Sequence, residues 1–428
     1  MVSDESGQRP GGPISAKDRL DLVLAVVRGS LDPRRWLIGG LAALVVAAGG
    51  QLLDGLSESE PQAEWPWQVE LASLEGDRKA ESLLLSADSQ PGDTAVRVAW
   101  NPRLMGRPLS DVVVPAVAVV GRRDSWSETA VEWSRFLVAI ITWSLAGVML
   151  VRLTAADVTR GESLSLAQVT GFGLRHVASL LSAALISLSC FGVLWGLGAV
   201  GGLIAKIPTA GPLVVSLLWF IPMVLGLLMG VVAVGFVAGW PLMVATIGVE
   251  DSDGFDGFSH ATGFLTDRPA LLGGYAVLGT IVGSIAICLA WCLLSLTLWL
   301  ASASVSTGLG AFAGGDGELL AISSGESTSL VGGREVPAGL VSDSESPGED
   351  DDVPFSSTFL VFWTRVAYLL FVGYAASVFW GVVTGLYLIV RESADGIPVT
   401  QMWLPADDVE HEAAAVEDES EVAAAESS

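Results

Sequence analysis

Six long apolar runs, separated by polar segments, dominate the hydropathy pattern of the chain. They occupy residues 36–53, 136–153, 177–205, 212–238, 270–302 and 358–390. A run of about 18 or more apolar residues can cross a hydrocarbon core about 30 Å thick. The pattern therefore predicts an all-α polytopic membrane protein with about six transmembrane helices. A mean hydropathy of +0.57 supports this, since it is too high for an ordinary soluble chain of 428 residues.

Basic residues predict the orientation of the spans. The tail at residues 1–35 carries Arg9, Lys17, Arg19, Arg28, Arg34 and Arg35, and an excess of such residues marks the cytoplasmic side. Six crossings then place both termini in the cytoplasm, in the inner (cytoplasmic) membrane of the cell. Arg122, Arg123 and Arg135 disagree, but they lie in a long loop, where the charge rule is weak.

The tail also contains an expected amphipathic helix. Leu20, Leu24, Val27 and Leu31 recur at helical spacing, opposite charged positions, so this helix could lie flat on the inner leaflet. Asp32 and Pro33 suit the start of the first span, as an N-cap and a first helical residue.

Residues 54–135 are expected to form a small extracytoplasmic β domain. Trp67, Val69 and Leu71 alternate with polar residues, and short runs follow at 82–86, 95–100 and 112–120. Ser125 and Glu128 then form an expected capping box, which would start a helix that leads into the second span.

Two acidic segments account for most of the formal charge of −25. Residues 303–357 contain 10 acidic residues against Arg334, and residues 391–428 contain 11 against Arg391, so that together they contribute −19. Both are rich in small and polar residues, and we expect a disordered extracytoplasmic loop and a disordered cytoplasmic tail. They could be solubilising spacers, or could attract a basic partner or cations.

The connections at 161–177 and 250–269 share an organisation, and each predicts a cytoplasmic amphipathic helix. Ser165 and Gln168 stand at capping-box positions, with Leu166, Val169 and Phe172 on one face. Asp253 is an expected N-cap in the second connection, with Phe255, Phe258, Thr262 and Leu265 on one face. Both contain T-G-F, at 170–172 and 262–264, followed by an arginine. A duplication would make residues 136–302 two similar hairpins formed by helices 2–5.

An acidic cluster in the second connection is the most site-like group in the chain. It consists of Glu250, Asp251, Asp253, Asp256 and His260. Asp256 and His260 are one turn apart and could face one ion or lipid headgroup, although the run fails the EF-hand pattern. The simpler interpretation is that these acids cap a helix and favour its dipole.

Charges within the spans are few. Arg365, about two turns into the sixth span, is the membrane-embedded charge that could face the interior, although snorkelling to the interface also explains it. Arg152, His176, Lys206 and Arg391 stand at span ends, where snorkelling is expected. Acids in mid-span, typical of an ion-coupled carrier, are missing from the sequence; Ser182, Ser187, Ser189, Thr280 and Ser284 could line a pore.

Small residues at four-residue spacing predict close helix packing. The pairs are Gly192 with Gly196, Gly198 with Gly202, Gly226 with Gly230, Gly235 with Gly239, Gly279 with Gly283 and Gly381 with Gly385. Pro222 predicts a kink in the fourth span, and Gly239-Trp240-Pro241 predicts a break near its end.

Candidate enzyme motifs are missing from the sequence. It has no G-x-S-x-G, Walker A, H-E-x-x-H or Rossmann pattern, and three histidines leave little for general-base chemistry. Cys190, Cys288 and Cys292 fall in apolar runs and match no zinc or redox motif. We expect no enzymatic activity, catalytic residue, metal or cofactor. The expected partners are membrane lipids and a membrane protein or a second copy, not nucleic acid.

Four motifs carry a resemblance that covers about half of the chain. They are R-G-E-S-L-S-L-A-Q (160–168), I-P-T-A-G-P (207–212), G-W-P-L-M-V-A-T-I-G-V-E-D-S-D-G-F-D-G-F-S (239–259) and Y-L-I-V-R-E-S-A-D-G (387–396). With them the chain resembles a group of uncharacterised bacterial multi-pass membrane proteins. It departs from that group at His260, where a basic residue is usual, and in a shorter aromatic element before Arg268-Pro269. The resemblance implies a topology and no activity.

These observations favour a non-enzymatic scaffold or assembly partner in the membrane. The alternative is a channel, or a carrier of lipid or small solutes, built on duplicated helix hairpins. A polar cavity lined by the hydroxyls named above would favour the alternative.

Labelling can test the topology. In a chain whose native cysteines are replaced by alanine, single cysteines at Ser323 and Ser420 should react with an impermeant maleimide from opposite sides of the membrane. Reaction of both from the same side would exclude six crossings.

Overall fold

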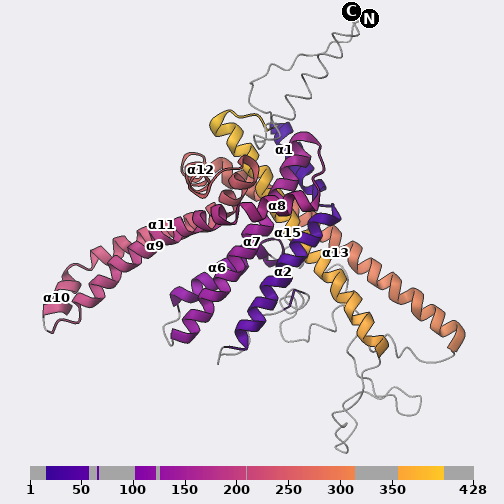
Figure 1. Ribbon diagram of the computed structural model, residues 1–428, viewed down its shortest axis with the longest axis horizontal. Helices are drawn as coiled ribbons and strands as arrows, with labels where there is room; N and C mark the ends of the chain where they lie inside the picture. Colours follow the sequence, from indigo (N-terminus) through magenta and orange to yellow (C-terminus); the bar gives the residue numbers. More distant parts are fainter. Residues whose placement is uncertain are drawn as a thin grey trace, which may run out of the picture. The chain divides into compact units, whose positions relative to one another are not determined.

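Helices are the regular secondary structure of the described part of the chain. The computed structural model describes residues 16–56, 65–66, 102–121, 126–208, 210–313 and 355–399, and these contain no strand (Figure 1). The helices in chain order are α1 (Ala16–Gly29), α2 (Pro33–Asp54), α5 (Pro102–Met105), α6 (Arg107–Gly121), α7 (Trp126–Arg160), α8 (Leu166–Arg175), α9 (Val177–Ile204), α10 (Ala210–Leu217), α11 (Phe220–Glu250), α12 (Gly254–Asp267), α13 (Pro269–Ala313) and α15 (Phe355–Asp395).

Six helices of the described ranges are long and apolar enough to cross a membrane. They are α2, α7, α9, α11, α13 and α15, which confirms the predicted number of spans. Several extend past the predicted limits: α7 begins at Trp126, α13 runs to Ala313 and α15 runs to Asp395. The length of an apolar run predicts that a span exists, whereas local capping and contacts decide where its helix ends.

The predicted β domain is wrong where residues 54–135 are described. Residues 112–120, predicted as a strand, lie inside α6. A short unbroken apolar run fits a buried strand or a helix equally well by periodicity. Here Arg107 and Asp111, one turn apart with Nε and Oδ2 at 3.6 Å, support the helix. The other predicted strands, at 67–71, 82–86 and 95–100, lie outside the described residues, as do Ser125 and most of both acidic segments.

The fourth span begins and ends later than predicted. The region 212–238 is divided between α10 and α11, and α11 continues to Glu250. Pro222 falls in the first turn of α11, where it removes no helical hydrogen bond. The predicted break at 239–241 does not occur. Trp240 is buried, its Nε1 donates to Ser144 Oγ at 3.0 Å, and these contacts hold this part of α11 in the core.

Both short helices between spans begin where the sequence predicts. Ser165 and Gln168 make a complete capping box at the start of α8, and Ser165 Oγ accepts from the Gln168 N–H at 3.3 Å. Asp253 caps α12, because its Oδ1 accepts from the N–H groups of Phe255 and Asp256, both at 2.9 Å. These caps use groups within three residues of one another, so the local sequence determines them.

The buried face of α12 differs from the predicted one. Gly254, Gly257, Ala261 and Phe264 are buried, whereas Phe255 is 66% exposed. A Cβ at Gly254 would lie 2.3 Å from the backbone oxygen of Ser179 in α9. Only the face that carries the small residues can approach that backbone so closely. The apolar pattern of the sequence alone therefore did not identify the buried face of α12. In α8 the prediction holds for Val169 and Phe172, while Leu166 is exposed.

The chain divides into two compact units. Unit 1 takes its described residues from Met1–Arg34, Leu137–Val282 and Val378–Ser428, and unit 2 from Arg35–Phe136 and Gly283–Ser377. Four helices, α2, α7, α13 and α15, contribute residues to both units.

In unit 1, α1 packs against the glycines of α15. Cβ atoms built at Gly381 and Gly385 would lie 3.3 Å from Val26 O and from a Val26 methyl carbon, respectively. The close approach predicted for this pair is therefore confirmed, with α1 as the partner. Leu20, Leu24 and Leu31 of the predicted apolar face of α1 are exposed. Its buried residues are Leu22, Val23, Val26 and Val27.

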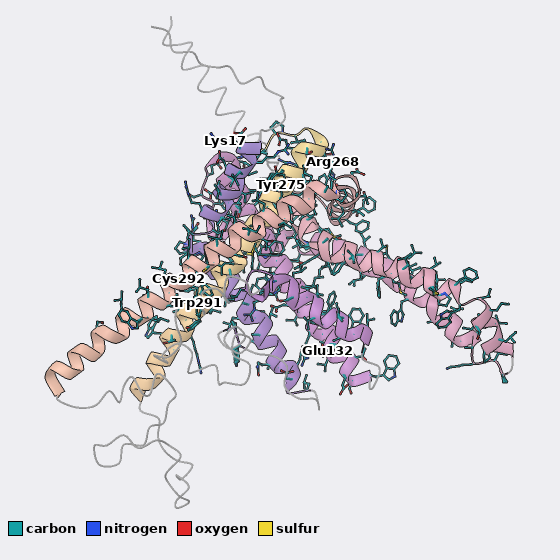
Figure 2. The ribbon with its side chains drawn as sticks, turned by 180° about the vertical axis from the view of Figure 1, so that it is seen from behind. Lys17, Glu132, Arg268, Tyr275, Trp291 and Cys292 are labelled. Carbon is teal, nitrogen blue, oxygen red and sulfur yellow. The ribbon has the colours of Figure 1, made fainter. Side chains whose placement is uncertain are left out.

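Unit 2 also depends on small residues and aromatic rings. A Cβ at Gly373 of α15 would lie 2.0 Å from Trp36 O of α2, and the Trp36 and Tyr374 rings meet edge to face at 5.8 Å. In α13, Trp291 (labelled in Figure 2) packs against the rings of Tyr368 and Phe371, with centroids 6.1 and 5.4 Å away.

The contact at Gly254 can be tested with a methyl group. Gly254→Ala should destabilise the protein by about 1–3 kcal/mol, because the new Cβ meets backbone of α9 that cannot move aside cheaply. The measurement is thermal unfolding of the purified full chain in detergent. Gly263→Ala in the same helix is the control, because a Cβ there has no neighbour within 4 Å. Equal unfolding temperatures for the two variants would contradict the assignment.

Candidate functional site

Polar groups gather where α11 turns into α12. We call Arg152, His176, Glu250, Asp251, Tyr387 and Arg391 the junction cluster; all belong to unit 1. The turn begins at Asp251, whose φ of 57° and ψ of 34° are left-handed and whose N–H donates to Ile247 O at 3.2 Å. Aspartate tolerates this conformation better than most residues. The chain then enters α12 after the Asp253 cap, so Glu250 and Asp251 are placed at the root of two helices.

Glu250 binds two side chains of α15. The Tyr387 hydroxyl donates to Glu250 Oε1, and Arg391 Nη1 lies 3.6 Å from the same oxygen. Tyr387 and Arg391 are one turn apart on α15, so both face α11. Both are almost completely buried. Glu250 itself is half-buried, and its carboxylate is hydrogen-bonded by the tyrosine and paired with the arginine.

Asp251 binds the residue that joins α8 to α9. His176 Nε2 lies 2.6 Å from Asp251 Oδ1, and His176 Nδ1 lies 3.0 Å from Phe172 O. Both ring nitrogens therefore lie beside oxygen atoms of other groups. His176 also stacks on Phe172, with centroids 4.3 Å apart. The two span connections are thus tied to each other through the contact between His176 and Asp251.

Arg152 completes the cluster from α7. Its guanidinium carbon lies 4.4 Å from the centroid of the Phe172 ring, and Nη1 donates to Gly248 O at 3.3 Å. The sequence predicts that Arg152, His176 and Arg391 snorkel at the ends of their spans. This prediction is wrong for the two arginines, because both are buried. For these groups, protein contacts take the place of water. Lys206 is exposed, as snorkelling requires.

The predicted acidic cluster does not converge on one point. Glu250 and Asp251 bind different partners, Asp253 caps α12, Asp256 is exposed, and His260 is half-buried beside the Phe264 ring. Within the described ranges, no three His, Cys, Asp or Glu side chains are grouped so as to hold a metal ion. The geometry favours the capping interpretation for Asp253, and a tertiary ionic role for Glu250 and Asp251.

The remaining sequence candidates are dispersed. Arg365 is exposed. The hydroxyls of Ser182, Ser189 and Thr280 each donate to a carbonyl oxygen of their own helix, at 2.7–2.9 Å. Such bonds satisfy a hydroxyl in apolar surroundings and need no aqueous pore.

Sequence reasoning missed the partners that define the junction cluster. Tyr387 and Arg391 stand four residues apart at the end of an apolar run. This spacing places both on one face of a helix and could have indicated that they share a partner. It also missed an ionic group in unit 2, where Arg135 contacts both Asp54 and Glu132, the latter at 3.0 Å. Arg135, which contradicted the charge rule, is neutralised by these two carboxylates.

Comparisons of the chain with protein-family models, with curated proteins and with solved structures give no match. The resemblance carried by the four sequence motifs stays a prediction.

The arrangement is suited to holding helices together rather than to bond-breaking chemistry. Its acidic groups are engaged by a tyrosine, an arginine and a histidine of other helices. Because its residues come from α7, the junction between α8 and α9, the end of α11 and α15, the cluster fixes the roots of α9 and α11 against the rest of unit 1.

A double-mutant cycle can test the strongest link. Tyr387→Phe should destabilise the protein by about 1–3 kcal/mol, because it leaves the carboxylate of Glu250 without its hydroxyl donor. Glu250→Gln in the Tyr387→Phe background should have a smaller effect than in the wild type. The measurement is unfolding in mixed micelles with increasing dodecyl sulfate.

Asp256→Asn is the matched control, because this carboxylate is exposed on the same segment and its change should stay within about 0.5 kcal/mol. Additive effects of Tyr387→Phe and Glu250→Gln would refute the coupling.

Proposed function

We propose that this protein is a non-enzymatic scaffold of the membrane that uses the hairpin α9–α10–α11 to bind another membrane helix. The partner helix comes from a different membrane protein or from a second copy of the chain. The observation that carries the proposal is a set of glycine faces on the hairpin that no other part of unit 1 covers.

The hairpin is rooted in unit 1 but largely uncovered along its length. Helices α9 and α11 lie side by side, with α10 at the tip (Figure 1). None of the apolar window that identifies the α11 span is buried. Large apolar side chains such as Leu197, Leu227 and Val234 are each more than half exposed. A bilayer accommodates such side chains, since lipid tails are as apolar as leucine.

Glycines distinguish the hairpin from an ordinary lipid-facing surface. Cβ atoms built at seven glycines of the predicted pairs would have no neighbour within 4 Å; these are Gly192, Gly196, Gly198, Gly202, Gly226, Gly230 and Gly235. By contrast, Gly279, Gly381 and Gly385 lie against Val382 or Val26. Glycine within a helix lowers its stability by about 1 kcal/mol relative to alanine. A second helix that packs closely against the uncovered glycines would explain why they occur at this spacing.

The junction cluster supports the same proposal. A scaffold must hold its binding element in a defined position, and the ionic contacts of Glu250 and Asp251 fix the base of the hairpin. The expected duplication also fits, because Phe172 and Phe264 of the two T-G-F sequences are both buried.

The proposal places the protein in the cytoplasmic membrane of the cell, with both termini and the connections α8 and α12 on the cytoplasmic side. Basic residues before the first span support this orientation. The resemblance to uncharacterised bacterial multi-pass membrane proteins agrees with a structural role. On this orientation α8 and α12 would be accessible to cytoplasmic partners.

Bulky residues on the hairpin test the proposal. The double variant Gly192→Ile, Gly196→Ile should abolish association, because side chains there would hold a second helix away. The fold of the monomer should persist, since the new side chains have open space and isoleucine favours a helix more than glycine does. Complexes from native membranes would be sized in mild detergent, with two differently tagged copies to detect self-association.

Val193→Ile is the control, because Val193 is exposed on the same helix and does not belong to a glycine pair. A complex of unchanged size in the double variant, or a wild-type protein that is monomeric in native membranes, would contradict the proposal.

A further inference from the structure

A group of basic residues and one tyrosine lies where α1 meets the start of α13. Lys17 and Arg19 belong to α1, Arg268 follows α12 directly, and Tyr275 belongs to α13; we call these four residues the basic patch. Figure 2 shows Lys17, Tyr275 and Arg268 at the same end of unit 1. The observations below concern unit 1 alone and do not depend on the proposed scaffold function.

Arg19 is held close to Tyr275. Its guanidinium carbon lies 6.0 Å from the centroid of the tyrosine ring, within range of a cation–π contact. Arg19 continues the buried face of α1, because Val23, Val26 and Ser30 follow it at helical spacing and are buried. Its Nε is covered and has no hydrogen-bond acceptor among the described residues. A covered guanidinium N–H is suited to an anion that the chain itself does not supply.

Arg268 provides a second cation on the same side of α13. Its side chain is exposed, and Nη1 donates to Ser393 Oγ at 3.2 Å, which orients the guanidinium. The Leu272 N–H donates to Arg268 O at 3.0 Å, so Arg268 caps the first turn of α13. Tyr275 follows seven residues later, which is about two helical turns, so the two residues lie on one face.

The surface beside these groups is open. Gly273 and Gly274 are exposed, and a Cβ at either would have no neighbour within 4 Å. On α1, Lys17 is exposed, and Leu20 and Leu24, one and two turns further along, are also exposed. The patch therefore combines cations, a tyrosine and adjacent apolar side chains, the groups that an amphiphilic anion needs.

The patch lies beside the ends of two candidate spans. Pro269 begins one candidate span and Asp395 ends another, and Arg268 and Ser393 stand at those two ends. Tyrosine is enriched at membrane interfaces, and lysine and arginine there attract anionic lipids. Acidic residues also occur at this end, namely Asp18, Asp21, Asp267, Glu392 and Asp395. An anion would therefore be attracted by the individual basic side chains and not by a net positive surface.

We propose that Lys17, Arg19, Arg268 and Tyr275 bind the phosphate headgroup of an anionic phospholipid from the surrounding leaflet. The two guanidinium groups contact the phosphate, Lys17 adds attraction from the exposed side, and the acyl chains lie along Leu20 and Leu24. Each basic residue should contribute about a fivefold increase in affinity.

Titration of the full chain in neutral detergent with dioctanoyl phosphatidylglycerol tests the site, with bound lipid counted by native mass spectrometry. Dioctanoyl phosphatidylcholine should bind at least about tenfold more weakly. Arg19→Gln with Arg268→Gln should weaken phosphatidylglycerol binding about 25-fold. Lys17→Gln, an exposed position that does not affect folding, should weaken it about fivefold.

Arg28→Gln with Arg175→Gln is the matched control, because both arginines are exposed and the loss of charge is the same. This control should bind phosphatidylglycerol as the wild type does. Equal binding of the two lipids, equal loss in the control, or unchanged binding in both Lys17→Gln and the double variant would overturn the proposal. Displacement of the lipid by inorganic phosphate at equal concentration would assign the site to free phosphate instead and would also overturn it.

Discussion

A buried charge in an apolar chain must have a partner, and the architecture of unit 1 depends on how that requirement is met at the end of α11. Glu250 and Asp251 are adjacent in sequence but bind different parts of the fold. Glu250 binds Tyr387 and Arg391 of α15, and Asp251 binds His176 between α8 and α9. One turn of backbone therefore connects three separate segments. Loss of a partner would therefore weaken a contact between segments that are far apart in the sequence.

Small residues then decide how closely the connected helices approach. Gly254 allows the start of α12 to contact the backbone of α9, and Gly381 and Gly385 allow α1 to lie on α15. The same residue type is uncovered along α9 and α11. Within a bilayer there is no hydrophobic force between helices, so close packing through small residues is the main source of association. The proposed binding surface consists of these uncovered glycines.

The junction cluster, the hairpin and the basic patch are different parts of unit 1 and would act together in a scaffold. The cluster holds the base of α9 and α11, the hairpin presents its glycines within the bilayer, and the basic patch contacts lipid where α1 meets α13. In such a scaffold, a lipid bound at the patch would hold α1 against α13, while α1 already packs on α15 through Val26. Each role relies on fixed contacts between helices rather than on a reactive group.

Sequence alone determined the features that depend on neighbours along the chain. Six apolar runs predicted six spans, and the caps of α8 and α12 follow from residues within one turn. Tertiary structure decided the rest. Residues 112–120 suit a strand or a helix equally, and the fold made them helical. The buried face of α12 carries Gly254, Gly257 and Ala261 beside Phe264, because the short distance to the backbone of α9 requires small residues. The contacts of Glu250 with Tyr387 and of Asp251 with His176 join residues 137 and 75 positions apart, and no local pattern specifies which of many polar groups will meet once the helices have packed.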